Sequence, residues 1–332
     1  MTVEISCFTR DVLASERNDF LLPLFRNPFL ARWTAMSVSA RGIFLVSAGS
    51  LTLVAMALII KQLGSRFPAV EILFFRSAVG FLFVLPFFAR DPLEALRTKR
   101  HGAHLIRGIV GTLGNLCFFW TVAHMLLADA VALQFSRPLF MLPLAVLFLG
   151  EVAGLRRSLI VAVGFIGILI YARPFTAGFD PGALVGAAGA VFSCWVVICI
   201  KWLAKTEPTR VIMFYYSFWT AVFSLIPALV WWVTPTPVEL VMLVAVGVLG
   251  IYGQGLVTHG YTLAEAGVLV TLDYSRVIYA AILGYLLFSE IPGPWNFAGM
   301  ALIIAASLYL VLSERKPKAH VAPAIPPDVP SR

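Results

Sequence analysis

The chain has 332 residues, of which 60% are hydrophobic and 13% charged, and its formal net charge is +8. Ordinary water-soluble domains are far less apolar, so this composition excludes them and predicts an integral membrane protein with the lipid bilayer as its main partner. Most of the positive charges lie in short segments between or at the ends of long apolar stretches, which argues against the continuous basic surface of a nucleic-acid-binding protein.

Ten apolar stretches follow one another along the chain, most of them near the length of about 20 residues that a helix needs to cross a bilayer. They are continuous rather than alternating with polar residues, so helices are expected instead of a β-barrel. The predicted fold class is therefore all-α and integral to the membrane, with ten transmembrane helices. These span residues 42–61, 69–89, 104–124, 128–149, 157–172, 182–203, 211–232, 238–257, 267–288 and 295–312.

The distribution of lysine and arginine predicts the orientation. With the N-terminus inside, 19 of the 25 basic residues fall in cytoplasmic segments and only Lys61, Arg66 and Arg173 fall outside. This asymmetry favours a cytoplasmic location for both termini. Residues 1–40 lack the features of a secretory signal and are expected to form a cytoplasmic tail, and the proline-rich residues 314–332 a second one.

The sequence repeats itself at an offset of 139 to 140 residues. Gly108, Gly111 and Gly114 align with Gly247, Gly250 and Gly253, the pair Ser136-Arg137 aligns with Ser275-Arg276, and Glu151 aligns with Glu290. Two halves are predicted, residues 41–175 and 180–313, with five spans each. Because five is an odd number, the second half enters the membrane from the opposite side, which makes the fold two inverted five-helix repeats.

These features resemble the drug/metabolite transporter superfamily of the EamA type. The resemblance rests on residues 42–313, with Phe135-Ser136-Arg137-Pro138 leading to Leu149-Gly150-Glu151, and Tyr274-Ser275-Arg276-Val277 leading to Phe288-Ser289-Glu290. The family usually has a proline in both the fourth and the ninth span, whereas here Val277 stands opposite Pro138. The resemblance implies a multi-pass protein of the bacterial inner membrane that moves a small-molecule substrate. The proteobacterial importers of riboflavin or S-adenosylmethionine are most similar in overall pattern.

Once the loops and the ends of the stretches are set aside, four charged residues remain inside: Arg76, Arg137, Asp273 and Arg276. Charges at this depth are costly and normally face a cavity or a partner. Gln134 and Arg137 are three residues apart, as are Asp273 and Arg276, so each pair shares one helix face and the repeat superimposes the two pairs.

Two interpretations of these charges stay open. In the first, Arg137 and Arg276 bind an anionic or carbonyl-rich substrate, and Asp273 pairs with one of them or carries a coupling proton. In the second, Asp273 and an arginine form a structural ion pair between the fourth and ninth spans. Arg76, the other candidate for coupling or ion pairing, lies near enough to a span end to reach the interface instead. Glu151 and Glu290 lie at span ends, where capping or loop bracing is expected.

Polar and aromatic residues complete the candidate site. Asn115 and Gln254 align with one another and are expected either to bind substrate or to bond between helices. Trp120 and Tyr274 are candidates for stacking on a flat heterocycle, the alternative being ordinary packing or an interfacial position.

Three classes of function were compared. A secondary transporter is favoured. Its favoured activity is uptake of riboflavin or a similar heterocycle such as S-adenosylmethionine, and the alternative is export of amino acids or drugs. An integral-membrane enzyme is less favoured because zinc, nucleophile-elbow and phosphate-loop motifs are absent from the sequence. A channel is less favoured because a continuous polar lining is absent. We expect no catalytic residue, metal or cofactor, and a homodimer is left open.

Overall fold

The computed structural model describes residues 36–88, 98–149, 154–173, 176, 180–203, 206–263 and 266–313. Within these ranges every regular element is a helix, and no strand occurs. The all-α prediction is therefore confirmed. The two predicted tails, except for residues 36–40, and Glu151 lie outside the described residues.

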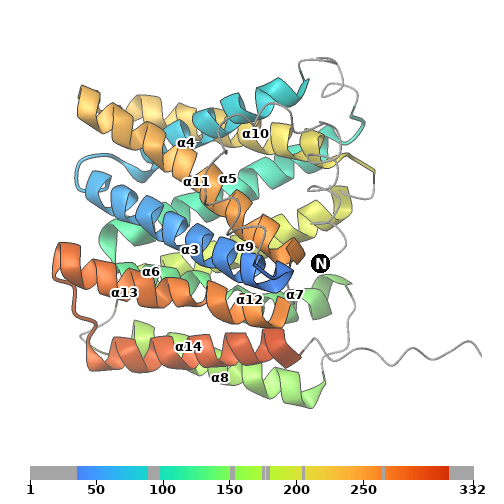
Figure 1. Ribbon diagram of the computed structural model, residues 1–332, viewed down its shortest axis with the longest axis vertical. Coiled ribbons are helices and arrows are strands. Elements are labelled where there is room, and N and C mark those ends of the chain that lie inside the picture. Colours follow the sequence, from blue (N-terminus) through green and yellow to red (C-terminus); the bar gives the residue numbers. More distant parts are fainter. Residues whose placement is uncertain are drawn as a thin grey trace, which may run out of the picture.

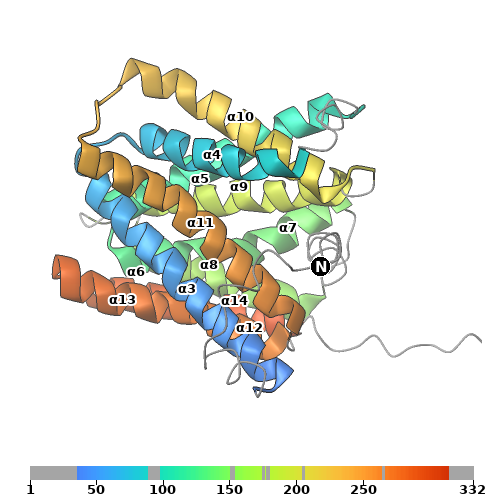
Figure 2. The same ribbon diagram turned by 45° about the horizontal axis from the view of Figure 1, so that its top comes forward.

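The helices follow the predicted stretches closely, but two stretches are each divided in two. The elements are α3 (Val38–Leu63), α4 (Ala69–Val84), the 3-10 turn η2 (Leu85–Phe88), α5 (His101–His124), α6 (Leu127–Gln134), α7 (Arg137–Leu149), α8 (Leu155–Ala172), α9 (Pro181–Leu203), α10 (Thr209–Val230), α11 (Pro237–Leu263), α12 (Ala266–Asp273), α13 (Ser275–Phe288) and α14 (Pro294–Ser313). They form one bundle with roughly parallel axes, crossed at an angle by α3 and α11 (Figures 1 and 2).

Eight helical stretches in the described ranges are long and apolar enough to cross a membrane, judged by length and composition alone. One of them, Leu127–Phe148, contains both α6 and α7. The other two predicted spans correspond to α4, which has only 16 residues before η2, and to α12 and α13 with a break between them. The chain is thus a multi-pass membrane protein, while the count of ten spans remains a prediction.

Helix pairing follows the sequence repeat. The most extensive contact joins α3 to α11, and its counterpart in the repeat joins α5 to α9. Likewise, α4 packs on α11 and α5 packs on α10 to a similar extent. Thus α11 lies against α3 and α4, and α5 lies against α9 and α10.

Glycines of the repeat permit these close contacts. A Cβ atom at Gly253 of α11 would lie 2.8 Å from the Cγ atom of Leu53 in α3, and one at Gly114 of α5 would lie 3.2 Å from the Cβ atom of Phe192 in α9. Such separations leave little room for a side chain, so small residues are required where these helices cross.

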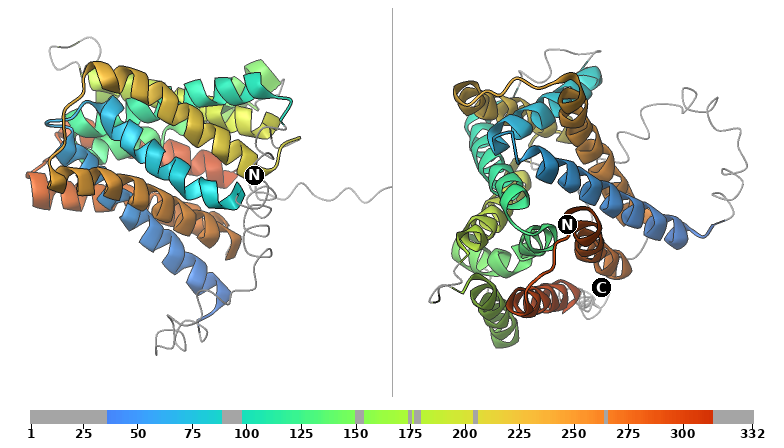
Figure 3. Two further views of the ribbon diagram at one scale, coloured as in Figure 1. Left: turned by 90° about the horizontal axis from the view of Figure 1, so that it is seen from above. Right: turned by 90° about the vertical axis from the view of Figure 1, so that its left-hand side faces the viewer.

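The two ends of the bundle differ. The terminal end is the one at which α3 begins and α14 ends. The loop end is the opposite one, which contains residues 64–68, 125–126 and 289–293. In Figure 1 the terminal end lies to the right, and the right panel of Figure 3 looks onto the loop end. At the loop end α6 packs against α13, whereas their repeat counterparts α12 and α7 at the terminal end share no contact of that extent.

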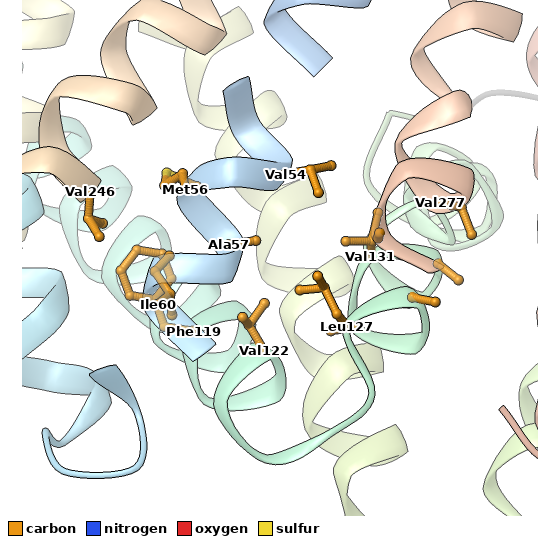
Figure 4. Close-up of a cluster of buried hydrophobic side chains, with 14 of the residues drawn as sticks. Val54, Met56, Ala57, Ile60, Phe119, Val122, Leu127, Val131, Val246 and Val277 are labelled. Atoms are coloured by element: carbon orange, nitrogen blue, oxygen red, sulfur yellow. The ribbon is translucent and has the colours of Figure 1, made fainter. Parts of the chain in front are cut away.

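The main apolar core fills the half of the bundle towards the loop end. Buried side chains of α3, α5, α6, α11 and α13 meet there, and Figure 4 shows Val131 of α6 between Val54 of α3 and Val277 of α13. This core closes the space between the halves on the loop side, and it ends near the two helix breaks.

Candidate functional site

The break in the fourth span follows from Pro138. In a continuous helix the carbonyl of Gln134 would accept a hydrogen bond from the N–H of residue 138, but proline has none. That carbonyl instead accepts a hydrogen bond from Nε of Arg137 at 3.2 Å. The Oγ atom of Ser136 donates to the carbonyl of Leu133 at 2.6 Å, which satisfies a second acceptor at the break.

The ninth span breaks at the equivalent position without a proline. Here the N–H of Val277 bonds to the carbonyl of Tyr274, three residues back, at 3.1 Å. Nothing in the local sequence explains this break. The paired prolines typical of the family are therefore not needed for the paired breaks. Arg137 is the first residue, and Arg276 the second residue, of the helix that follows a break.

An ion pair lies beside the second break. The Nη2 atom of Arg276 is 2.5 Å from Oδ1 of Asp273, and the two side chains are 16% and 14% exposed. Ser50 of α3 donates its hydroxyl to the same Oδ1 atom at 2.9 Å and accepts from Nε of Arg276 at 3.3 Å. Asp273 is thus paired within its own span rather than with the fourth span, and the pair is tied to α3.

Two aromatic rings bring the breaks together. Phe135 and Tyr274 stack with ring centroids 4.4 Å apart, and the guanidinium of Arg276 lies over Phe135 at 5.9 Å from the centroid. Each stacked ring belongs to the residue at a break, so the break in one half lies directly against the break in the other. The sequence repeat aligned these positions, and the structure places them in contact.

Arg137 gives the site an excess of positive charge. Among the described residues it has no carboxylate partner, and it lies close enough to Arg276 and Tyr274 to interact with both electrostatically. Two guanidinium groups and one carboxylate therefore meet at the breaks. Such a site can bind a carboxylate or another electron-rich group through Arg137 while the aromatic pair supplies an apolar surface.

The other predicted site residues are distributed more widely. The Nδ2 atom of Asn115 donates to the hydroxyl of Tyr216 at 2.7 Å, which is a bond between α5 and α10. Gln254 is exposed, and Gln134 is half-buried with no side-chain bond among the described residues. Trp120 stacks on His124 at 4.4 Å near the loop end, away from the breaks.

Arg76 also lies apart from the breaks. It makes no ion pair with a described residue, its guanidinium lies over the ring of Phe119 at 5.9 Å, and its Nε atom is buried without a hydrogen bond. A Cβ atom at Gly250 of α11 would lie 3.3 Å from that Nε atom, so the side chain is enclosed between α4 and α11.

Polar contacts of Glu290 hold the loop end, and they confirm the capping or bracing role expected for this residue. The Nζ atom of Lys61 is 2.6 Å from Oε1 of Glu290, and it also donates to the carbonyl of Met125 at 2.5 Å. The Oε2 atom of Glu290 accepts from the N–H of Leu127 at 2.7 Å and so caps α6. Glu290 thus ties α3 and α6 to the end of α13.

Two buried polar residues, Ser50 and Asp129, were not among the predicted candidates. Ser50 is one serine in an apolar helix, and nothing in the local sequence signals its role. Asp129 lies in the run Leu127–Ala130, which has a counterpart at Leu263–Ala266, and an acid repeated in both halves is a signal that could have identified it. Its carboxylate accepts hydrogen bonds from Tyr171 and Asn296.

Metal binding finds no support in the described ranges, where no group of three or more His, Cys, Asp or Glu side chains is placed to hold an ion. One candidate cavity, about 680 Å³, lies between α8 and α14 at the terminal end and is lined by Arg156, Arg157 and Tyr309 among others. It is remote from the helix breaks.

Comparison with known proteins places these observations in a family. The chain is 31% identical over 274 residues to the pseudopaline exporter of Pseudomonas aeruginosa, covering 81% of this chain and 95% of that protein. It is 31% identical to the S-adenosylmethionine uptake transporter of Rickettsia felis, over 77% of this chain and 87% of that protein. The riboflavin transporter of Rhizobium johnstonii is 29% identical, over 75% and 83%.

The fold also has a solved counterpart. One crystal structure superposes with a TM-score of 0.54 at 20% identity, covering 82% of this chain and 98% of the other. The model of the EamA-like transporter family matches the chain twice, at residues 40–173 and 180–312. The helical multi-pass fold, the duplicated match and the relatives together show that this chain belongs to the EamA-like transporter family.

Proposed function

We propose that the protein is a secondary transporter that moves a small organic metabolite across the bacterial inner membrane by alternating access. The proposal includes ten spans in two inverted five-helix repeats, residues 41–175 and 180–313, with both termini in the cytoplasm. The observation that carries it is the contact between the two helix breaks, where Arg137, Asp273 and Arg276 lie with the stacked pair Phe135 and Tyr274. Broken helices at a repeat interface are the usual place of a transport site.

The reciprocal helix contacts support the inverted repeat. The pairing of α3 with α11 corresponds to that of α5 with α9, and each half breaks its fourth span at the same position. Two halves related in this way can exchange conformations. Each half then adopts the conformation that the other half had before, and the site between the halves becomes accessible from the opposite side of the membrane.

The difference between the ends supports alternating access. In this structure the loop end is sealed by the apolar core and the contacts of Glu290, while α7 and α12 at the terminal end lack the matching contact. With the termini in the cytoplasm, this is a state closed to the outside. Exchange of the two conformations would close α7 against α12 and separate α6 from α13.

The charges favour a substrate with a carboxylate or an electron-rich ring. Of the substrates named for the relatives, S-adenosylmethionine carries both a carboxylate for Arg137 and a flat heterocycle for Phe135 and Tyr274. Riboflavin offers the heterocycle alone. We therefore infer uptake of a heterocyclic metabolite of this kind. Export is the second candidate, favoured by the likeness to the pseudopaline exporter.

The test is uptake by purified protein in liposomes that contain no ATP. Labelled S-adenosylmethionine and riboflavin are each offered outside, with the same unlabelled compound inside to drive exchange. We expect exchange of one of them above protein-free liposomes. Amino acids and cationic drugs are offered in the same assay, and exchange of these alone would favour the exporter.

A further inference from the structure

Asp129 is a buried carboxyl group that the proposed transport site does not use. It lies in the first turn of α6, is 1% exposed, and is separated from the helix break by the remainder of that short helix. Its Oδ2 atom accepts hydrogen bonds from the hydroxyl of Tyr171 at 2.9 Å and from Nδ2 of Asn296 at 3.0 Å. Its Oδ1 atom is buried and has no hydrogen-bond partner.

No cation compensates this carboxyl group among the described residues. The groups that face it from the neighbouring elements are Tyr171 of α8, Asn296 of α14, and the carboxylates of Asp180 and Glu290, which interact with it electrostatically. Lys61, a base at the same end of the bundle, is paired with Glu290 at 2.6 Å. Arg173 at the end of α8 lies over the ring of Trp295.

An ionised carboxylate is very costly in such surroundings. Burial without a counter-charge strongly disfavours the charged form, and the two nearby carboxylates disfavour it further. A proton on Asp129 removes the charge. Because a tyrosine hydroxyl can accept as well as donate, Tyr171 can bond to the protonated group as readily as to the ionised one.

The partners of Asp129 also connect it to the closure of the loop end. Tyr171 and Asn296 come from α8 and α14, and the same turn of α6 is capped by Glu290 at the end of α13. A movement that separates α6 from α8, α13 and α14 would break these contacts and let water reach the carboxyl group. Hydration restores the stability of the ionised form.

We propose that Asp129 is a proton-binding site, protonated while the loop end is closed and ionised when that end opens. The opening step rests on the alternating access proposed above, whereas protonation in the closed state does not. By linkage, acidification favours the state that binds the proton, here the closed one. In the pH range where Asp129 is protonated in the closed state but ionised in the open state, the ratio of closed to open molecules changes by about tenfold per pH unit.

Infrared spectroscopy of the purified protein tests the site itself, without any substrate. A protonated carboxylic acid has a C=O stretching band that an ionised carboxylate lacks. We expect such a band at neutral pH in the wild type and its loss in Asp129→Asn. The matched control is Asp180→Asn, because Asp180 is a neighbouring aspartate whose Oδ1 atom accepts from the N–H of Gly182 at 2.8 Å. This control should keep the band.

Tyr171→Phe provides a second variant should Asp129→Asn fail to fold. It removes one hydrogen bond to the carboxyl group and is expected to shift the frequency of the band. A band unchanged in both Asp129→Asn and Tyr171→Phe would overturn the proposal. Loss of the band on Asp180→Asn would overturn it as well, because the proton would then belong to Asp180.

A distance measurement tests the link to closure. Spin labels at His124 and Ile291, both exposed at the loop end, report the separation of the short connection between α5 and α6 from the segment after α13, in a variant that lacks the four native cysteines. With Asp129 present, the short-distance population should grow as pH falls, and in Asp129→Asn it should be large and independent of pH. A pH response unchanged by Asp129→Asn would refute the link.

The proton-binding site and the proposed function fail in different ways. A protein that transports substrate but lacks the infrared band of Asp129 would contradict the proton-binding proposal alone. A protein that shows the band but transports no substrate would contradict only the proposed function.

Discussion

The ion pair between Lys61 and Glu290 should determine how firmly the loop end stays closed. Its two side chains are only 14% and 10% exposed, and it joins α3 to the segment after α13. The substitution Glu290→Gln preserves size and removes the charge. Lys61 then still donates to the carbonyl of Met125, and its Nζ atom still lies 5.6 Å from the ring centroid of Phe288, but it has lost its anionic partner.

The expected magnitude follows from this environment. Removal of one partner from a buried ion pair costs about 3–5 kcal/mol because the other charge stays buried and uncompensated. Since Lys61 keeps a carbonyl partner and some contact with solvent, we expect about 2–3 kcal/mol. The cost falls on the closed state only, so the ratio of closed to open molecules should drop roughly 30- to 150-fold.

The assay is the distance between spin labels at His124 and Ile291 in liposomes. In the wild type the short distance of the closed state should dominate, and Glu290→Gln should add a longer distance as a major population. The double variant Lys61→Gln with Glu290→Gln is the control, since it leaves no uncompensated charge. It should recover much of the short distance. An unchanged distribution in Glu290→Gln would refute the view that this pair holds the end closed.

Three further predictions concern packing, the site and a surface pair. Gly49→Ala places a Cβ atom 2.8 Å from the carbonyl oxygen of Gly253, so it should destabilise the protein by about 1–3 kcal/mol in thermal unfolding, while Gly255→Ala, with no atom within 4 Å, should not. Ser50→Ala removes the hydroxyl between Asp273 and Arg276 and should lower kcat/KM for exchange roughly 2- to 10-fold. Glu239→Ala breaks an exposed pair with Arg66, 2.5 Å apart, and should change the ratio of closed to open molecules less than fivefold in the same distance measurement.

Sequence patterns predicted the features that depend on local spacing. Apolar length located the helices, and the three-residue spacing of Asp273 and Arg276 identified a pair that the structure shows as an ion pair. The transporter family proposed from the repeat is confirmed by the family match. The roles proposed for the site residues in substrate binding stay predictions.

The features that the sequence did not reveal depend on contacts between distant segments. Ser50 is 223 residues from Asp273, and Lys61 is 229 residues from Glu290, so no periodicity relates them. The break at Tyr274 has no proline to signal it. The acid repeated in both halves marks Asp129 in the sequence, but only the packing of α8 and α14 around α6 shows that its carboxyl group is buried.

The central claim is that the two helix breaks form the site at which the substrate binds. Exchange of labelled metabolite in liposomes tests it most directly, with Arg137→Ala and Arg276→Ala compared with Arg157→Ala, an arginine of α8 at the terminal end. We predict that both variants at the breaks lose exchange while they remain folded, and that Arg157→Ala exchanges as the wild type does. Wild-type exchange by both Arg137→Ala and Arg276→Ala would contradict the account.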